Sequence, residues 1–297
     1  MRMKKIFIYI LILLSVACSH DDGPLNPDEG PAVNPENINA NNHGGYSTRI
    51  EIPRIQEGDI FVSHCTTVKK KENITYSLAQ CPQRKHSRWT AFTFDASNRN
   101  ISWKRDNWDD TEWHGDPFQA DPELPSNCVM THYEIKNNGE FVRGHLVASY
   151  DRVYSKDANE QTFYYSNISP MRSRFNTGRW SNLEGMVQNW GRDEDFCDTL
   201  YIVKGGTINQ GFYESKGTCP TVPKYYFMAL LCRMNDKFKA IGFWFEHKDY
   251  LSGSVKSYSM SIDELEEKSG IDFFCNLPDN VEEKVEKRHY PDQWKGL

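Results

Sequence analysis

One stretch, residues 143–190, restricts the possible folds of this chain more than any other. It begins with Arg143-Gly144-His145 between strand-like segments and continues through a polar loop to Ser166-Asn167-Ile168-Ser169-Pro170. It ends in a segment whose apolar residues recur at helical spacing: Leu183, Met186, Val187 and Trp190. The pattern predicts a helix that begins near Arg179, with Glu184 beside its buried stripe.

The segments around this stretch are typical of a large β-structure. Short runs rich in aromatic and β-branched residues predict strands at 58–64, 74–78, 88–95 and 198–206. Residues 223–232 and 238–245 predict a hairpin around Asn235-Asp236. Residues 261–270 predict a helix with Ser261 as its N-cap, Glu264 three positions later and Gly270 as its stop, and 271–274 predict an apolar strand.

The order of these motifs resembles the DNA/RNA non-specific endonucleases, the sugar-non-specific branch of the ββα-metal nucleases. The likeness covers roughly residues 60–281 and is strongest at 143–190. It implies an α+β fold: a mixed, mainly antiparallel central sheet with flanking helices and a ββα-metal finger as the active site. It also implies hydrolysis of phosphodiester bonds in DNA and RNA with little sequence specificity.

His145 is the candidate general base, because a neutral imidazole can take a proton from water near pH 7. Asn176 is the candidate metal ligand. A neutral amide leaves most of the coordination sphere to water, which suits Mg²⁺, with Mn²⁺ as a substitute. Glu184 would hold metal-bound waters and orient Asn176. Each also has an ordinary interpretation, as a surface histidine, a helix-capping asparagine and an exposed helical glutamate.

The resemblance gives roles to further residues. Arg143 would contact the phosphate through its planar guanidinium, and Asn167 would hold the backbone of the site or its water shell. The family places a phosphate-binding arginine in the region of residues 98–113, so Arg99 and Arg105 are both candidates. Two positions depart from the family pattern. Val142 occupies the position at which the family has Asp, and Gln188 occupies the position at which the family has a helical Arg.

Residues 1–18 form a lipoprotein-type signal peptide. A basic start precedes twelve apolar residues, too few to span a bilayer comfortably, and the end resembles a lipobox that would place the lipid on Cys18. Residues 19–49 are predicted to be a flexible acidic tether, and residues 50–297 the nuclease domain. We therefore expect an exported protein anchored to the bacterial outer membrane or cell surface, or a periplasmic or secreted one if Cys18 is not lipidated.

The net charge of −6 is unusual for a protein that binds nucleic acid. Residues 19–48 contribute five acids and no Lys or Arg, whereas residues 133–192 carry eight Lys or Arg against six acids. A locally basic groove is enough for an enzyme that must release its product, since phosphate affinity grows with each contact. Seven cysteines remain beside Cys18, without the spacing of zinc ligands, and predict up to three disulfides in an exported chain.

We therefore expect a secreted or surface-anchored, divalent-metal-dependent endonuclease acting on DNA and RNA. One alternative is a catalytically weakened surface lipoprotein that binds nucleic acid or a protein partner, favoured by Val142 and by the overall acidity. Another is a phosphatase or nucleotidase that acts on small substrates.

Overall fold

The computed structural model describes residues 37–297 except 43, 69, 106–114 and 211–219. Its centre is a seven-stranded sheet with the order β1-β2-β3-β6-β7-β8-β9, in which every ladder is antiparallel. The strands are β1 (Ile60–Val68), β2 (Lys71–Cys81), β3 (His86–Phe94), β6 (Thr199–Gly206), β7 (Tyr225–Met234), β8 (Lys237–Glu246) and β9 (Ser259–Met260). This confirms the predicted α+β class with a mainly antiparallel central sheet.

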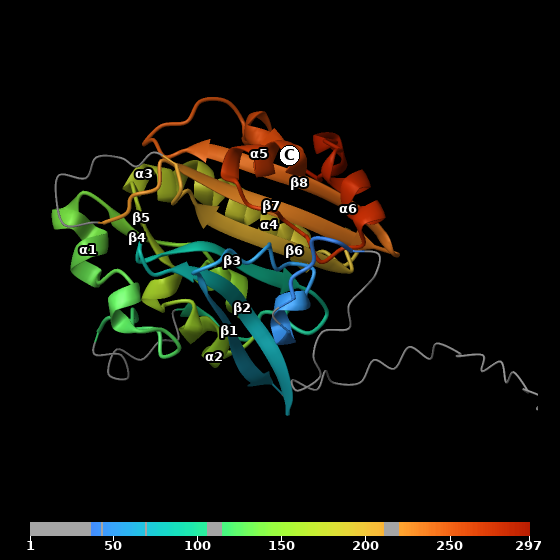
Figure 1. The fold of residues 1–297 in the computed structure, drawn as a ribbon. Helices are drawn as coiled ribbons and strands as arrows, with labels where there is room; N and C mark the ends of the chain where they lie inside the picture. The colour runs from blue at the N-terminus through green and yellow to red at the C-terminus, as the bar shows by residue number, and fades with distance from the viewer. Residues whose placement is uncertain (1–36, 43, 69, 106–114, 211–219) are drawn as a thin grey trace, which may run out of the picture.

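A separate two-stranded ladder pairs β4 (Val142–His145) with β5 (Ile168–Met171). The helices are α1 (His132–Lys136), α2 (Lys156–Gln161), α3 (Ser173–Phe175), α4 (Ser181–Arg192), α5 (Ile262–Ser269) and α6 (Asp279–Glu286). Figure 1 shows α5 and α6 beside strands β7 and β8. Among the described residues, no helix is long and apolar enough to span a membrane.

The alternation of side chains along the strands builds a core on each face of the sheet. On one face, Leu183, Val187 and Trp190 of α4 pack in the cluster that contains Phe92 and Phe94 of β3. On the other face, α5 and α6 pack in the cluster that contains the neighbouring β3 residues, including Trp89 and Ala91. The two helical layers therefore lie on opposite faces of the sheet.

Local sequence signals gave the turns and caps correctly. The hairpin between β7 and β8 turns at Asn235 and Asp236, which have φ values of 48° and 58°. These left-handed conformations suit asparagine and aspartate in a tight hairpin. Ser261 and Glu264 form a capping box at the start of α5, and Gly270 ends the helix with a φ of 68°.

Three expectations about the fold are corrected. Residues 271–274 do not form a strand; they lead from α5 toward α6 and include Phe274 with a φ of 50°, which a strand does not accommodate. Residues 37–42 and 44–49, expected in the tether, lie against the C-terminal part of the domain. There Asn39 Nδ2 donates to Glu282 at 2.9 Å, and Asn276 Nδ2 donates to the carbonyl of Arg49 at 2.7 Å.

The third correction concerns the disulfides, because the six cysteines that the structure describes are free thiols. Cys65 and Cys81 lie on adjacent strands, but the register places Cys65 opposite Ile74. Ile74 is seven residues from Cys81, about 23 Å along a strand, too far for a bridge. Cys197 and Cys232 do interact, as hydrogen-bonded thiols. Cys18 and Cys219, together with the signal peptide and most of the tether, lie outside the described residues.

Candidate active site

The site is built on a ββα unit formed by β4, β5 and α4. In the β4–β5 ladder His145 pairs with Ile168 and Gly144 pairs with Ser169. The Met171 side chain of β5 packs so closely over Gly144 that a Cβ added there would lie 2.3 Å from Met171 Sδ. A residue without a side chain is thus required immediately before His145, which explains the middle position of the Arg-Gly-His motif.

The His145 imidazole lies at the end of β4 with its Nε2 atom buried. That atom has no hydrogen-bond partner among the described residues. The ring packs against Phe163 and Phe118, with centroids 5.1 and 5.4 Å away. Burial, assisted by the positive charge of Arg105, lowers the pKa of His145 to about 3. The imidazole is therefore neutral at pH 7, with a nitrogen available to accept a proton.

Asn176 lies at an irregular entry to α4. The wide π turn Asn176–Trp180 connects α3 to α4 across a kink at Gly178, whose φ and ψ of −103° and −115° are not helical. Such turns within helices are frequent at functional sites. The side chain of Asn176 makes no hydrogen bond to another described residue, so its amide is available to a ligand. The helix proper begins at Ser181, two residues after the predicted start.

Glu184 lies in the first turn of α4, where it meets a residue that the sequence did not single out. Lys204 of β6 is fully buried, and its Nζ atom donates to Glu184 Oε1 at 3.1 Å and to Asp151 Oδ2 at 2.8 Å. Burial raises the pKa of the Glu184 carboxyl to about 7, while the adjacent ammonium of Lys204 acts in the opposite direction. Lys204 could have been noticed because it is a charged residue in a strand that is buried at every position.

Gln188, one turn beyond Glu184, occupies the position where the related pattern has arginine. Its Nε2 donates to Asp151 Oδ1 at 2.8 Å. Asp151 Oδ2 also accepts from the backbone N–H of Ala148 at 2.9 Å, so both carboxylate oxygens are engaged. The substitution therefore replaces a cation with an amide that helps to fix the ionised Asp151 beside Lys204.

Arg143 is held by an acid from a different part of the chain. Its guanidinium donates to both carboxylate oxygens of Asp116, at 2.7 and 3.0 Å, and stacks over Phe118 at 3.8 Å. Val142 had left open how Arg143 would be held, and Asp116 supplies the carboxylate. Because Asp116 lies 27 residues upstream, its role could not be recognised from its spacing to Arg143.

Asn167 is fully buried and forms part of the framework of the site. Its Oδ1 accepts from the N–H of Val147 at 2.8 Å, and its Nδ2 donates to the carbonyls of Val147 and Thr162. These bonds fix the chain two residues after His145. Of the two predicted roles for Asn167, the geometry matches the one in which it holds the backbone.

The two candidate phosphate-binding arginines lie in different cavities. Arg105 is exposed and lines the cavity that contains His145. Arg99 is buried, donates to the carbonyl of Asp198 at 2.5 Å, and lines a separate cavity with Arg49 and Arg233. Arg99 is thus a structural residue in this fold, and its expected place in the active site is wrong.

His145, Asn176 and Glu184 line one cavity of about 860 Å³, together with Lys104 and Arg105. A neutral base, an amide oxygen and a carboxylate meet there beside two cationic side chains. Arg143 and Asn167 do not line this cavity, although they brace the segment that carries His145. The arrangement can accommodate a phosphodiester, a partly hydrated divalent ion and an attacking water.

Comparison with known proteins agrees with the geometry. A family model described as "DNA/RNA non-specific endonuclease" matches residues 56–280. A "Nuclease" from Nostoc is 23% identical, over 96% of this chain and 97% of its own length. A "Nuclease" from Serratia marcescens is 23% identical over 72% and 77%. The solved EndoG/EndoGI complex covers 74% of this chain and 89% of its own with a TM-score of 0.58; at 15% identity this shows a shared fold.

Proposed function

This chain belongs to the DNA/RNA non-specific endonuclease family and is an endonuclease, and we propose that it cuts DNA and RNA with His145 as the base and a hydrated Mg²⁺ at Asn176. One observation carries the proposal. His145 and Asn176 face the same cavity, and neither the Nε2 atom of His145 nor the amide of Asn176 has a partner among the described side chains and backbone.

His145 would take the proton of the attacking water. Its imidazole is neutral at pH 7 because its pKa is lowered. A phosphodiester bound in the cavity brings a negative charge close to the ring, which favours the protonated form and raises the pKa of His145 toward the working pH. The aromatic walls formed by Phe118 and Phe163 fix the ring, so that Nε2 has one orientation.

The donor set suits Mg²⁺, with Mn²⁺ as a substitute. Asn176 offers one neutral oxygen, and Glu184 is engaged by Lys204 yet also lines the cavity. So few protein donors leave most positions to water, as Mg²⁺ prefers. When bound, the ion would stabilise the charge that develops on the phosphoryl and leaving oxygens. Glu184 would hold its waters and orient Asn176.

Cationic side chains would hold the phosphate backbone. Arg105 and Lys104 line the cavity, whereas Arg143 lies outside its lining, two residues before His145 in β4, and is fixed by Asp116. Contacts of this kind position a nucleic acid without reading its bases. They support cleavage of both DNA and RNA with little sequence preference.

We also propose that the enzyme is exported and carries a lipid on Cys18. The support comes from the basic and apolar residues of 1–18 and the lipobox-like sequence that ends at Cys18. Detergent-phase partition of the wild-type protein, lost in Cys18→Ala, would support a lipid anchor. Aqueous partition of both proteins would indicate a soluble exported product.

A plasmid-nicking assay with Mg²⁺ tests the activity. His145→Ala is expected to lower nicking by about 10²–10⁴-fold with an unchanged circular dichroism spectrum, and EDTA is expected to abolish it. His289→Ala is a matched control, because that histidine is exposed and lies outside the cavity. Full nicking by His145→Ala or in EDTA would contradict the mechanism. Binding without cleavage by the wild type would favour the non-catalytic alternative, and mononucleotide turnover without nicking would favour a nucleotidase.

A further inference from the structure

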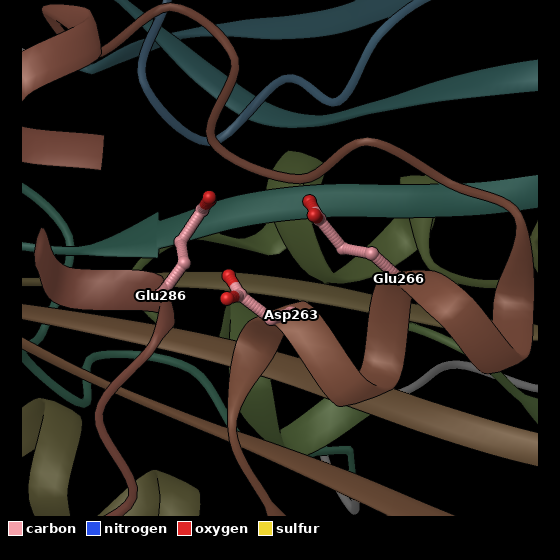
Figure 2. A group of neighbouring side chains, drawn as sticks. All are labelled: Asp263, Glu266 and Glu286. Carbon is pink, nitrogen blue, oxygen red and sulfur yellow. The ribbon is translucent and has the colours of Figure 1, made fainter. Parts of the chain in front are cut away.

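A second group of carboxylates lies on the sheet face opposite the active site. Asp263 and Glu266 are three residues apart on α5, and Glu286 is the last residue of α6. Figure 2 shows the three side chains converging on the space between the two helices. One oxygen of each lies within 4.8 Å of the others.

Glu286 is an unpartnered group aimed into this cluster. Its side chain belongs to a residue that is 5% exposed, and Oε1 has no hydrogen-bond donor among the described residues. Leaving a buried carboxylate oxygen without a donor is unfavourable, and such oxygens are rare in folded proteins. The position of Oε1 therefore points to a ligand that would contact it.

The cluster has no described cation in direct contact, although the exposed ammonium of Lys287 attracts the Asp263 carboxylate from a distance. No described lysine or arginine forms a salt bridge with Asp263, Glu266 or Glu286. Burial, followed by the charges of Glu266, Glu282, Asp272 and Asp263, raises the pKa of Glu286 to about 10. Burial also raises the pKa of Glu266 to about 8, although its Oε1 accepts a 2.7 Å hydrogen bond from the Phe273 N–H. A bound cation would relieve this repulsion.

We propose that Asp263, Glu266 and Glu286 form a structural Ca²⁺ site that is separate from the nuclease centre. All the donors are carboxylate oxygens, the ligands of a hard cation; nitrogen and sulfur donors for zinc or copper are not part of the cluster. Ca²⁺ binds oxygens at 2.3–2.6 Å, so two oxygens on one ion lie at most about 5 Å apart, which the 4.8 Å limit meets. Its adaptable coordination suits ligands from two helices better than the strict octahedron of Mg²⁺.

The site would fasten three segments of the domain. It would join α5 to the end of α6. Two further carboxylates at its edge, Asp272 and Glu282, accept hydrogen bonds from Asn39 and so connect the cluster to the N-terminal segment. The alternative is that the cluster stays closed by sharing protons between carboxyl groups, which the raised pKa values also allow.

Thermal unfolding of the full chain, freed of metal and titrated with Ca²⁺ alone, separates the two cases. Glu286→Gln removes one ligand charge, and Glu267→Gln is the matched control, since Glu267 is exposed on α5 and its side chain forms no hydrogen bond or ion pair with another described residue. Any Ca²⁺ bound at Asn176 and Glu184 acts equally in all three proteins. At a hundredfold excess over Kd, Tm should rise by about 5 °C more in the wild type and Glu267→Gln than in Glu286→Gln.

In EDTA, Glu286→Gln should be at least as stable as the wild type, so that Ca²⁺ reverses the order of the two Tm values. Calorimetric titration should detect one bound Ca²⁺ ion per molecule fewer in Glu286→Gln, and in a second variant, Asp263→Asn, than in the wild type. The same Ca²⁺ response in Glu286→Gln and Glu267→Gln, or no response in the wild type, would overturn the site and leave proton sharing. These outcomes do not depend on nicking, so they are independent of the proposed nuclease mechanism.

Discussion

Lys204 Nζ donates a hydrogen bond to Glu184 Oε1 over 3.1 Å, which joins the central sheet to the helix of the active site. The same ammonium contacts Asp151 at 2.8 Å, and neither Lys204 nor Asp151 is accessible to solvent. A cation between two carboxylates fixes the direction of Glu184 toward the cavity. The buried ion pair is thus part of the framework that orients Glu184 in the active-site cavity.

Replacing Lys204 with methionine should destabilise the protein and impair nicking. Asp151 would remain buried without its cation, which typically costs about 3–5 kcal/mol in the free energy of unfolding. Urea denaturation measures this loss, and plasmid nicking measures the effect on the site. Lys237→Met is the control, because Lys237 is exposed on β8 and unpaired among the described residues. Equal stability of Lys204→Met and the wild type would show that the ion pair does not hold the site.

Asp116 and Arg143 should act as one unit in catalysis. Arg143 Nη1 donates to both oxygens of Asp116, which takes the place of an acid at position 142, so Asp116→Asn should lower nicking by loosening Arg143. Measured nicking rates for Asp116→Asn, Arg143→Ala and the double variant form a thermodynamic cycle. The double variant should be no slower than Arg143→Ala. Independent effects that multiply in the double variant would argue against coupling.

Alanine substitutions at Arg105 and Arg99 should change different properties: substrate binding for Arg105 and stability for Arg99. Arg105 lines the active-site cavity, so Arg105→Ala should weaken nicking and reduce the slope of log Kd against log salt by about one. Arg99 is buried against the backbone of residues 197 and 198, so Arg99→Ala should lower Tm while the folded protein keeps its salt dependence. The reverse pattern would indicate that Arg99, and not Arg105, contacts the substrate.

His86 should make the stability depend on pH in the acidic range. It is buried, with Nδ1 donating to the Ser87 carbonyl at 2.7 Å and Nε2 lying 2.6 Å from Ser169 Oγ, and burial lowers its pKa to about 4. Between pH 6.5 and 4 the unfolded chain therefore binds a proton that the folded chain does not. Stability should fall as the pH drops through this window, with His86 contributing roughly 3 kcal/mol.

Urea denaturation from pH 7 to pH 4 tests this dependence when the wild type is compared with His86→Gln. Glutamine can donate to the same carbonyl without titrating, so the variant should lose less stability over the window than the wild type. Parallel pH curves would show that His86 is not the group responsible.

The sequence by itself determined the main strands of the sheet, the helices at α4 and α5 and the candidate residues of the site. Alternation in strands and apolar spacing in helices are local properties, so the hairpin at Asn235-Asp236 and the cap at Ser261 could be predicted. The motif order likewise led to His145, Asn176 and Glu184, which the fold brings into one cavity.

The tertiary structure decided which partner each charge has. Lys204 beside Glu184, Asp116 beside Arg143, and the separation of Arg99 from Arg105 all depend on segments far apart in the chain. The same holds for the N-terminal segment, where Asn37 and Asn39 donate to acceptors on the folded C-terminal segment. Local periodicity says which face of an element is buried, but the register and packing of distant elements place the buried charges together.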